Sequence, residues 1–148
     1  QALTDINNPS EQLQLFAVRK DGNAIRLVQY LVMPSEEVKL AAVQQNGLVI
    51  QHIKNPSEQI QLAAIESNPR AIRHIENPTE PVQIKAIQNN PYDIQHIANA
   101  TEKVQFMAIK DNIDIYNFIY NPDKSVSEYV RNHTELNEGI NRVKELLK

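Results

Sequence analysis

A repeat of 22 residues constrains this chain more than any other feature of its sequence. Pro34, Pro56, Pro78, Ala100 and Pro122 follow one another at intervals of 22 residues. The segment Asn-Pro-Ser-Glu at 55–58 returns as Asn-Pro-Thr-Glu at 77–80. A fixed period of this size is typical of repeat arrays, in which each unit buries its apolar face against the next unit. The sequence therefore predicts a single helical-repeat domain over residues 1–148.

The period also sets the boundaries of the units. We expect a partial repeat at 1–8, repeats at 9–33, 34–55, 56–77, 78–99 and 100–121, and a degenerate repeat with a cap at 122–148. Leu3 and Ile6 match Ile50 and Ile53 of a later unit, so we expect the N-terminus to be cut or continued. The first full unit is three residues longer than the others, around residues 30–32.

Each unit is predicted to hold two short helices. The second residue of every unit is a good N-cap, namely Ser10, Ser35, Ser57, Thr79, Thr101 or Asp123. The second helix opens at a further cap residue, namely Asp21, Asn46, Asn68, Asn90 or Asn112. This second helix is short enough to be 3₁₀ in part. Five alanines in register mark the closest helix approach: Ala17, Ala42, Ala64, Ala86 and Ala108. The predicted fold is therefore an all-α α-solenoid of short two-helix repeats, stabilised by stacking.

The ends of the units carry two further signals. An Asn closes four of them (Asn55, Asn77, Asn99 and Asn121), which suits a left-handed C-terminal residue. From Thr134 the repeat gives way to Leu136, Ile140, Val143 and Leu147 at helical spacing. We expect this segment to be a C-terminal capping helix with a polar outer face.

Composition excludes several classes of protein. The formal net charge of -3 argues against a nucleic-acid partner, since duplex-binding domains are usually basic. The absence of cysteine removes disulfides, thiolate nucleophiles and Cys-based zinc sites. No apolar run approaches the length of a membrane span, and no signal-peptide pattern opens the chain. We expect a cytoplasmic protein with no membrane partner.

The sequence offers no catalytic constellation. An enzyme needs a unique arrangement of residues, whereas the conspicuous residues here recur from unit to unit. We therefore predict no enzymatic activity, no catalytic residues, no cofactor and no metal site.

Three rows of residues recur at equivalent positions on the units. The histidine row consists of His52, His74 and His96, with Leu27 and Phe118 in the flanking units. Helices about 8–10 Å apart cannot bring three imidazoles to one zinc, so the pattern favours a half-buried stacking ladder over a ligand-facing row or a metal site. The glutamine row is Gln14, Lys39, Gln61, Gln83 and Gln105, which favours hydrogen bonding to loops over an amide-lined groove.

The third row lies beside the histidines and is the first candidate for a partner-binding site. It consists of Arg26, Gln51, Arg73, Gln95 and Asn117. A solvated face is the simplest interpretation, and binding of an acidic peptide or phosphates is the functional alternative. Four aromatic residues (Tyr92, Tyr116, Phe118 and Tyr120) gather near the last complete units. The predicted partner-binding residues are Arg26, Gln51, Arg73, Gln95, His52, His74, His96 and Tyr92.

The units, with Asn-Pro-Ser-Glu-Gln-Ile-Gln-Leu-Ala-Ala-Ile at 55–65 and Asn-Gly-Leu-Val-Ile-Gln-His-Ile at 46–53, resemble short helical repeats of unassigned function in bacteriophage and bacterial proteins. They are more distantly similar to leucine-rich variant and HEAT-like repeats. This resemblance covers nearly the whole chain and implies a scaffold that binds other macromolecules, with no catalytic residues to transfer.

We therefore expect a non-enzymatic protein–protein interaction module, such as a phage or bacterial accessory or inhibitor protein. One alternative is a structural subunit that self-associates as a homo-oligomer through apolar surface at its N-terminal end. The other alternative is a HEAT-like nucleic-acid binder, against which the acidic balance argues.

Overall fold

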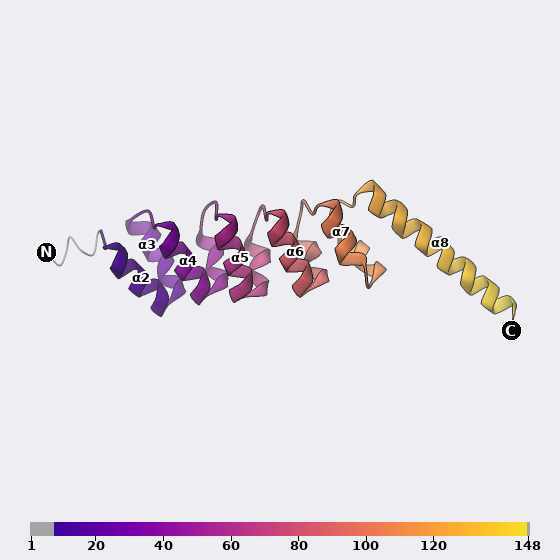
Figure 1. The fold of residues 1–148 in the computed structure, drawn as a ribbon, viewed down its shortest axis with the longest axis horizontal. Coiled ribbons are helices and arrows are strands. Elements are labelled where there is room, and N and C mark those ends of the chain that lie inside the picture. Colours follow the sequence, from indigo (N-terminus) through magenta and orange to yellow (C-terminus); the bar gives the residue numbers. More distant parts are fainter. Residues whose placement is uncertain (1–7, 148) are drawn as a thin grey trace.

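The computed structural model describes residues 8–147, and within that range the chain forms helices and no strands. The α-helices follow one another along the long axis of the molecule, and a single long helix extends from the C-terminal end (Figure 1). The elements are α2 (Glu11–Lys20), η1 (Gly22–Ala24), α3 (Ile25–Leu31), α4 (Glu36–Gln45), η2 (Gly47–His52), α5 (Glu58–Ser67), η3 (Pro69–His74), α6 (Glu80–Asn89), η4 (Pro91–His96), α7 (Glu102–Ile109), η5 (Ile113–Phe118) and α8 (Lys124–Leu146), where η denotes a 3₁₀-helix. The all-α prediction is confirmed; the partial repeat at 1–8 falls almost entirely outside the described residues.

The α-helices begin where the cap residues predicted. The hydroxyls of Ser57 and Thr101 accept the backbone N–H three residues on, as do those of Ser10 and Ser35. Thr79 also occupies the N-cap, which leaves Pro81 at N2 where its missing N–H costs no intrahelical bond. The Thr79 hydroxyl, however, makes no cap bond and is buried without a partner.

The second helix of units two to five is a 3₁₀-helix of six residues. The side chain of each opening Asn accepts the backbone N–H two residues on, as Asn68 does from Arg70 at 3.0 Å. Each 3₁₀-helix then ends at an isoleucine with extended backbone, such as Ile75. The first unit differs, because its three extra residues prolong the second helix into the α-helix α3. The expected partial 3₁₀ character is confirmed.

The core runs along the inside of the array as repeated isoleucine and alanine positions. Ile50, Ile72 and Ile94 of the 3₁₀-helices are at most 1% exposed. Ala64 of α5 is fully buried, and its counterparts Ala42, Ala86 and Ala108 are at most 1% exposed. Small side chains at these positions let successive α-helices approach closely.

Buried glutamines hold the last three junctions between units. The Nε2 of Gln83 donates to the carbonyl oxygens of Pro78 (2.9 Å) and Asn99 (3.2 Å), and its Oε1 accepts the N–H of Thr101 (3.1 Å). One side chain that is 4% exposed therefore joins both ends of its own unit to the start of the next. Gln105 repeats all three bonds, and Gln61 repeats two of them. Bonding to loops, the simpler interpretation of the glutamine row, is confirmed.

The first two junctions use glycine instead. The N–H of Gly22 donates to Oε1 of Gln45 (2.8 Å), and the N–H of Gly47 donates to Oγ of Ser67 (3.1 Å). A Cβ on Gly47 would lie 2.2 Å from the carbonyl oxygen of Ala64 in the next unit. The third and fourth units have proline at this position (Pro69 and Pro91), which has no N–H to donate, and the fifth has Ile113. Close backbone approach therefore substitutes for the glutamine bonds at these two junctions.

The left-handed residue expected at the end of each unit occurs once. Among the described non-glycine residues, positive φ is found at Asn55 alone (47°), so the prediction is wrong for Asn77, Asn99 and Asn121. The carbonyls of Asn99 and Asn121 accept bonds from Gln83 and Gln105, so their backbone is held by the glutamine row. The unit of Asn55 has Lys39 at that position, which pairs with Glu36 at 4.0 Å and has no acceptor for an N–H of the next unit.

The C-terminal helix also differs from the prediction. It begins at Lys124, ten residues before the expected start at Thr134, and continues as one helix of 23 residues. Val126 is fully buried and Val130 partly buried against the array, whereas residues 131–147 are exposed throughout. α8 thus starts as the first helix of a sixth unit and then projects beyond it (Figure 1). The expected apolar contact of Leu136 and its neighbours with the array is wrong, because the helix leads them past the last unit.

Gly47→Ala should lower the free energy of unfolding by about 1–3 kcal/mol, because the new Cβ would displace the backbone of the next unit. Gly139→Ala is a matched control, since nothing lies within 4 Å of a Cβ there and alanine favours the helix. Urea denaturation followed by far-UV circular dichroism measures both. Equal stability of the two variants would contradict the close approach at the second junction.

Gln83→Leu should cost about 1–3 kcal/mol, because two carbonyls and one N–H at a partly buried junction lose their partner. Gln88→Leu makes the same change at an exposed position of α6 and should alter stability little. The same denaturation experiment compares them. A Gln83→Leu variant as stable as Gln88→Leu would show that these bonds add nothing to the stacking of units.

Candidate partner-binding surface

Six of the eight residues predicted to bind a partner lie at the C-terminal ends of successive 3₁₀-helices. Gln51 and His52 end η2, Arg73 and His74 end η3, and Gln95 and His96 end η4. Gln51, Arg73, His74 and Gln95 are exposed, whereas His52 and His96 are partly buried. Arg26 is exposed on α3. The short helices place one long polar side chain and one imidazole per unit on a common face.

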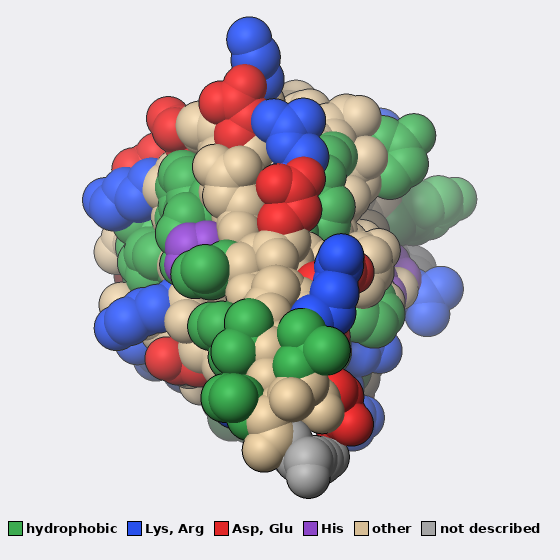
Figure 2. All heavy atoms as spheres, turned by 90° about the vertical axis from the view of Figure 1, so that its right-hand side faces the viewer, with side chains coloured by type: hydrophobic (Ala, Val, Ile, Leu, Met, Phe, Trp, Pro, Cys, Tyr) green, Lys and Arg blue, Asp and Glu red, His purple; other side chains and the backbone are tan. Residues whose placement is uncertain are grey.

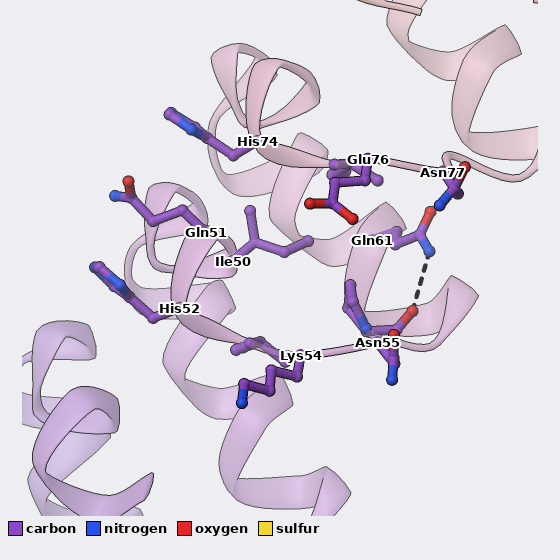
Figure 3. A pocket seen from close by; sticks show the side chains of 12 residues that line it. Ile50, Gln51, His52, Lys54, Asn55, Gln61, His74, Glu76 and Asn77 are labelled. Carbon is purple, nitrogen blue, oxygen red and sulfur yellow. Dashed lines mark hydrogen bonds between the residues drawn. The ribbon is translucent and has the colours of Figure 1, made fainter. Parts of the chain in front are cut away.

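Two adjoining grooves cross this face. The larger, of about 550 Å³, lies between η2 and η3 and the segments that follow them. Figure 3 shows that His52 of η2 and His74 of η3 project on the same side. Gln51 lies beside them, and Lys54 and Glu76 lie further along the chain. The smaller groove, of about 350 Å³, continues towards η4 and is lined by Arg73, His96 and four residues shared with the first: Gln51, His74, Ile75 and Glu76. The surface is therefore continuous over three units.

The imidazoles of the histidine row do not stack on one another. Ring contacts in the described part of the chain join Tyr92 to Phe118, Phe106 to Tyr129, and Tyr129 to His133. Helix spacing of about 8–10 Å keeps rings of successive units apart unless a side chain bridges the gap. The row is a set of separate half-exposed rings.

The charge of His52 depends on its surroundings. Burial lowers the pKa of His52 below its ordinary value of 6.5, and the nearby Arg26 and His74 lower it further. All three causes disfavour the imidazolium form. At neutral pH His52 therefore presents a neutral ring to the groove, with one nitrogen as donor and the other as acceptor.

A buried carboxyl in η4 is the feature that the repeat reasoning missed. Asp93 is 5% exposed and accepts a bond from Nδ2 of Asn90 at 3.3 Å. Burial raises the pKa of Asp93, and the neighbouring His96 and Arg73 partly offset this. Burial and Arg73 together lower the pKa of His96, while Asp93 raises it. The signal was present in the sequence, since the equivalent residues of other units are apolar: Val49, Ala71 and Ile115.

His96 also carries an unsatisfied polar atom at the wall of the smaller groove. Its Nε2 is buried and has no hydrogen-bond partner. Buried polar atoms in folded proteins are nearly always paired, so an exception in a groove is a candidate contact point. Asp93, His96 and Arg73 together make the third and fourth units chemically distinct from the rest of the array.

Tyr92 lies at the junction between the fourth and fifth units and lines neither groove. Its ring meets Phe118 edge to face at 5.4 Å between centroids, and its hydroxyl accepts from Nδ2 of Asn112. Tyr116 instead donates from its hydroxyl to Ser127, and Tyr120 is 75% exposed. The predicted aromatic cluster is therefore one ring pair and two separate tyrosines.

The first unit exposes apolar side chains near the end proposed for self-association. Exposed fractions range from 49% to 90% for Leu13, Phe16, Leu27, Tyr30 and Met33. The partial repeat expected to carry the open end, 1–8, lies outside the described residues but for Asn8.

Residues 8–147 contain neither a candidate metal site nor a candidate membrane span. In that range no group of three His, Cys, Asp or Glu side chains could hold a metal ion. None of the helices described is both long and apolar enough to cross a bilayer.

Comparison with known proteins gave no relative: no family model, no curated protein and no solved structure matches this chain. The resemblance to short phage and bacterial repeats and to HEAT-like repeats stays a prediction.

His52→Phe should fold normally and lose part of the pH dependence of stability. Since the pKa of His52 is lower in the folded protein, its contribution is complete above about pH 6.5 and is lost as the pH falls towards the folded pKa. Thermal midpoints measured between about pH 7.5 and pH 5 should therefore fall less in the variant than in the parent protein. Phe118 already occupies the equivalent position. A collapse of the midpoint at pH 7.5 would contradict this interpretation of the histidine row.

Proposed function

We propose that this chain is a non-enzymatic protein–protein interaction module built as an α-solenoid, which binds its partner through the face formed by η2, η3 and η4. The observation that carries the proposal is the pair of adjoining grooves that share Gln51, His74, Ile75 and Glu76. Such a surface repeats one set of side chains per unit and suits a partner that extends along the array.

The helix contacts support the solenoid arrangement. They join each unit to the next in order: α2 to α4, α4 to α5, α5 to α6, α6 to α7 and α7 to α8. The 3₁₀-helices η2, η3, η4 and η5 contact one another in the same sequence. Two parallel layers of helices, each in contact with its neighbours along the chain, are what stacked two-helix repeats produce.

The chemistry of the face favours a protein segment over a small ligand. The grooves are lined by side chains of mixed type, with Lys54 and Arg73 as cations and Glu76 as an exposed carboxylate. Gln51 and the imidazoles add neutral donors and acceptors. Arg26 lies close enough to His52 to affect its pKa, and so adds a positive charge at the near end of the face. A segment with carboxylates opposite Arg73 and Lys54 would match this surface.

Most of the other repeated residues are used inside the array, which leaves few surfaces for a partner. The glutamine row and the alanine row are committed to packing and to hydrogen bonds within the array. The glutamates that open four of the α-helices reach the next unit: Glu11, Glu36 and Glu102 accept from the hydroxyls of Ser35, Ser57 and Ser125, and Glu80 pairs with Lys103. Of the repeated polar side chains, Arg73 and Gln51 remain directed to solvent beside the grooves.

Charge reversal at Arg73 tests the proposal. Arg73→Glu should abolish capture of a protein from host lysate while leaving the far-UV circular dichroism spectrum unchanged, because Arg73 is exposed on η3. Lys85→Glu makes the same charge change on α6, on the α-helical side of the array, and should retain capture. The protein retained by the parent chain and by Lys85→Glu but lost with Arg73→Glu is identified by mass spectrometry.

The identified protein is then purified and bound to each variant directly. We expect its dissociation constant to rise by roughly thirtyfold or more for Arg73→Glu, as for a hot-spot residue. Equal affinity of Arg73→Glu and Lys85→Glu would overturn the placement of the binding face.

A further inference from the structure

The exposed half of α8 carries an apolar stripe that contacts nothing in the described chain. Leu136 is 61% exposed, Ile140 43%, Val143 55% and Leu147 81%. Figure 2, viewed from the end of the molecule at which α8 lies, shows hydrophobic side chains gathered on the surface nearest the viewer. Exposed apolar surface of this extent on one helix marks a contact with another molecule.

The spacing of the stripe specifies the kind of contact. The residues Tyr129, His133, Leu136, Ile140, Val143 and Leu147 alternate at intervals of four and three. This is the a/d pattern of a coiled coil, which presents a narrow seam to a second helix and not a broad face to a flat surface. The required occupant is therefore an amphipathic helix with a matching seam.

The stripe of a second copy meets that requirement. The positions that flank the seam are nearly without charge, with Asn132, Asn137 and Gly139 along most of its length and Lys144 near its end. Charged residues at flanking positions usually select a partner of opposite sign. A seam flanked by amides and glycine meets no like-charge repulsion from its own copy along most of its length.

The distribution of charge favours an antiparallel pair. Residues 124–138 carry Glu128, Glu135 and Glu138 against Lys124 and Arg131, a net charge of -1, and residues 139–147 carry Arg142 and Lys144 against Glu145, a net charge of +1. An antiparallel arrangement sets the acidic part of each helix beside the basic part of the other, whereas a parallel one sets like beside like. Two-fold symmetry makes such a contact self-complementary and closed, so it produces a dimer and not a filament.

The base of α8 offers a place for the far end of the second helix. With Leu136 opposite Ile140 of the second copy, His133 faces its Val143 and Tyr129 faces its Leu147. Tyr129, with Phe106, Met107, Ile109 and Lys110, lines a groove of about 330 Å³ between α7 and α8. The Phe106 and Tyr129 rings meet edge to face at 5.6 Å and form its wall. The terminal leucines of one copy thus reach an apolar groove at the base of the other.

We propose that α8 is a homodimer interface, in which the stripes of two copies pair antiparallel and each C-terminal end enters the Phe106–Tyr129 groove of the other copy. This surface is separate from the face proposed for a partner, so either proposal can fail without the other. It differs from the N-terminal association expected from the sequence.

The test is the mass of the whole chain over a range of concentrations, by analytical ultracentrifugation. The parent chain should form a dimer that dissociates on dilution. Ile140→Glu introduces a charge at the centre of the seam and should raise the dissociation constant by roughly thirtyfold or more. Asn141→Glu places the same charge on the neighbouring residue outside the seam and should leave the dimer intact. A parent chain that is monomeric at all concentrations overturns the proposal, as does a dimer that survives Ile140→Glu.

Met33→Glu separates this interface from the N-terminal alternative. Met33 is 90% exposed in the first unit, far along the chain from α8. The dimer should persist in this variant. Loss of the dimer in Met33→Glu but not in Ile140→Glu would assign association to the N-terminal end and overturn the proposal.

Single cysteine substitutions test whether the two α8 helices pair parallel or antiparallel, and they add no charge to the seam. The chain has no cysteine of its own, so any disulfide must join the introduced residues. In an antiparallel pair, His133→Cys mixed with Val143→Cys should give a disulfide-linked heterodimer, whereas each variant alone should not cross-link. Cross-linking of each variant with itself would show a parallel pair and overturn the antiparallel arrangement. The far-UV spectrum of each variant confirms that α8 remains helical.

Discussion

The amide of a buried glutamine is the interaction on which the stacking of units three to six depends. In residues 8–123 no helix exceeds ten residues, and isolated helices of this length are marginal in water. Gln83 and Gln105 each satisfy two carbonyls within their own unit and the N–H of the second residue of the next unit. An amide supplies both donor and acceptor from one side chain, which neither a carboxylate nor a lysine can do. Folding of each unit is therefore tied to the presence of its successor.

The sequence predicted the parts of the structure that follow from local rules. The caps, the short second helices and the closeness of the alanine row depend on residue type at a fixed position in the period, and these were found. Asn99 and Asn121 departed from expectation because each carbonyl accepts a hydrogen bond from a glutamine 16 residues earlier, which the local sequence does not show. Asn77 also lacks the positive φ, and no glutamine bond to its carbonyl accounts for this. The start of α8 was misplaced because Val126 and Val130 still follow the repeat while the helix continues past it. Asp93 was not predicted, although it is a carboxylate at a position that is apolar in the other units, because the sequence alone does not show that its side chain is buried beside His96.

The array combines two ways of joining its units, and the candidate surface lies where they meet. Gly22 and Gly47 bring the first units together through the backbone, and Gln61, Gln83 and Gln105 join the later ones through side chains. The grooves begin at η2 and end at η4, across this change. Neither set of bonds uses the outward side of the 3₁₀-helices. Residues there are free to vary from unit to unit, as Gln51, Arg73 and Gln95 do, without loss of packing.

Because α8 is one continuous helix that begins in the last unit, it also fixes the direction in which its later side chains point around the helix axis. Its 23 residues span about 34 Å, and each residue turns the helix by about 100°. Val126 anchors the start of α8 in the array, and the direction of Ile140 follows from the fourteen positions that separate the two residues. Inserting one residue between these two would swing the apolar stripe to another side of the molecule, whereas inserting seven would return it to within about 20°. The number of residues between Val126 and Ile140 therefore determines on which side of the molecule the apolar stripe lies, relative to the grooves.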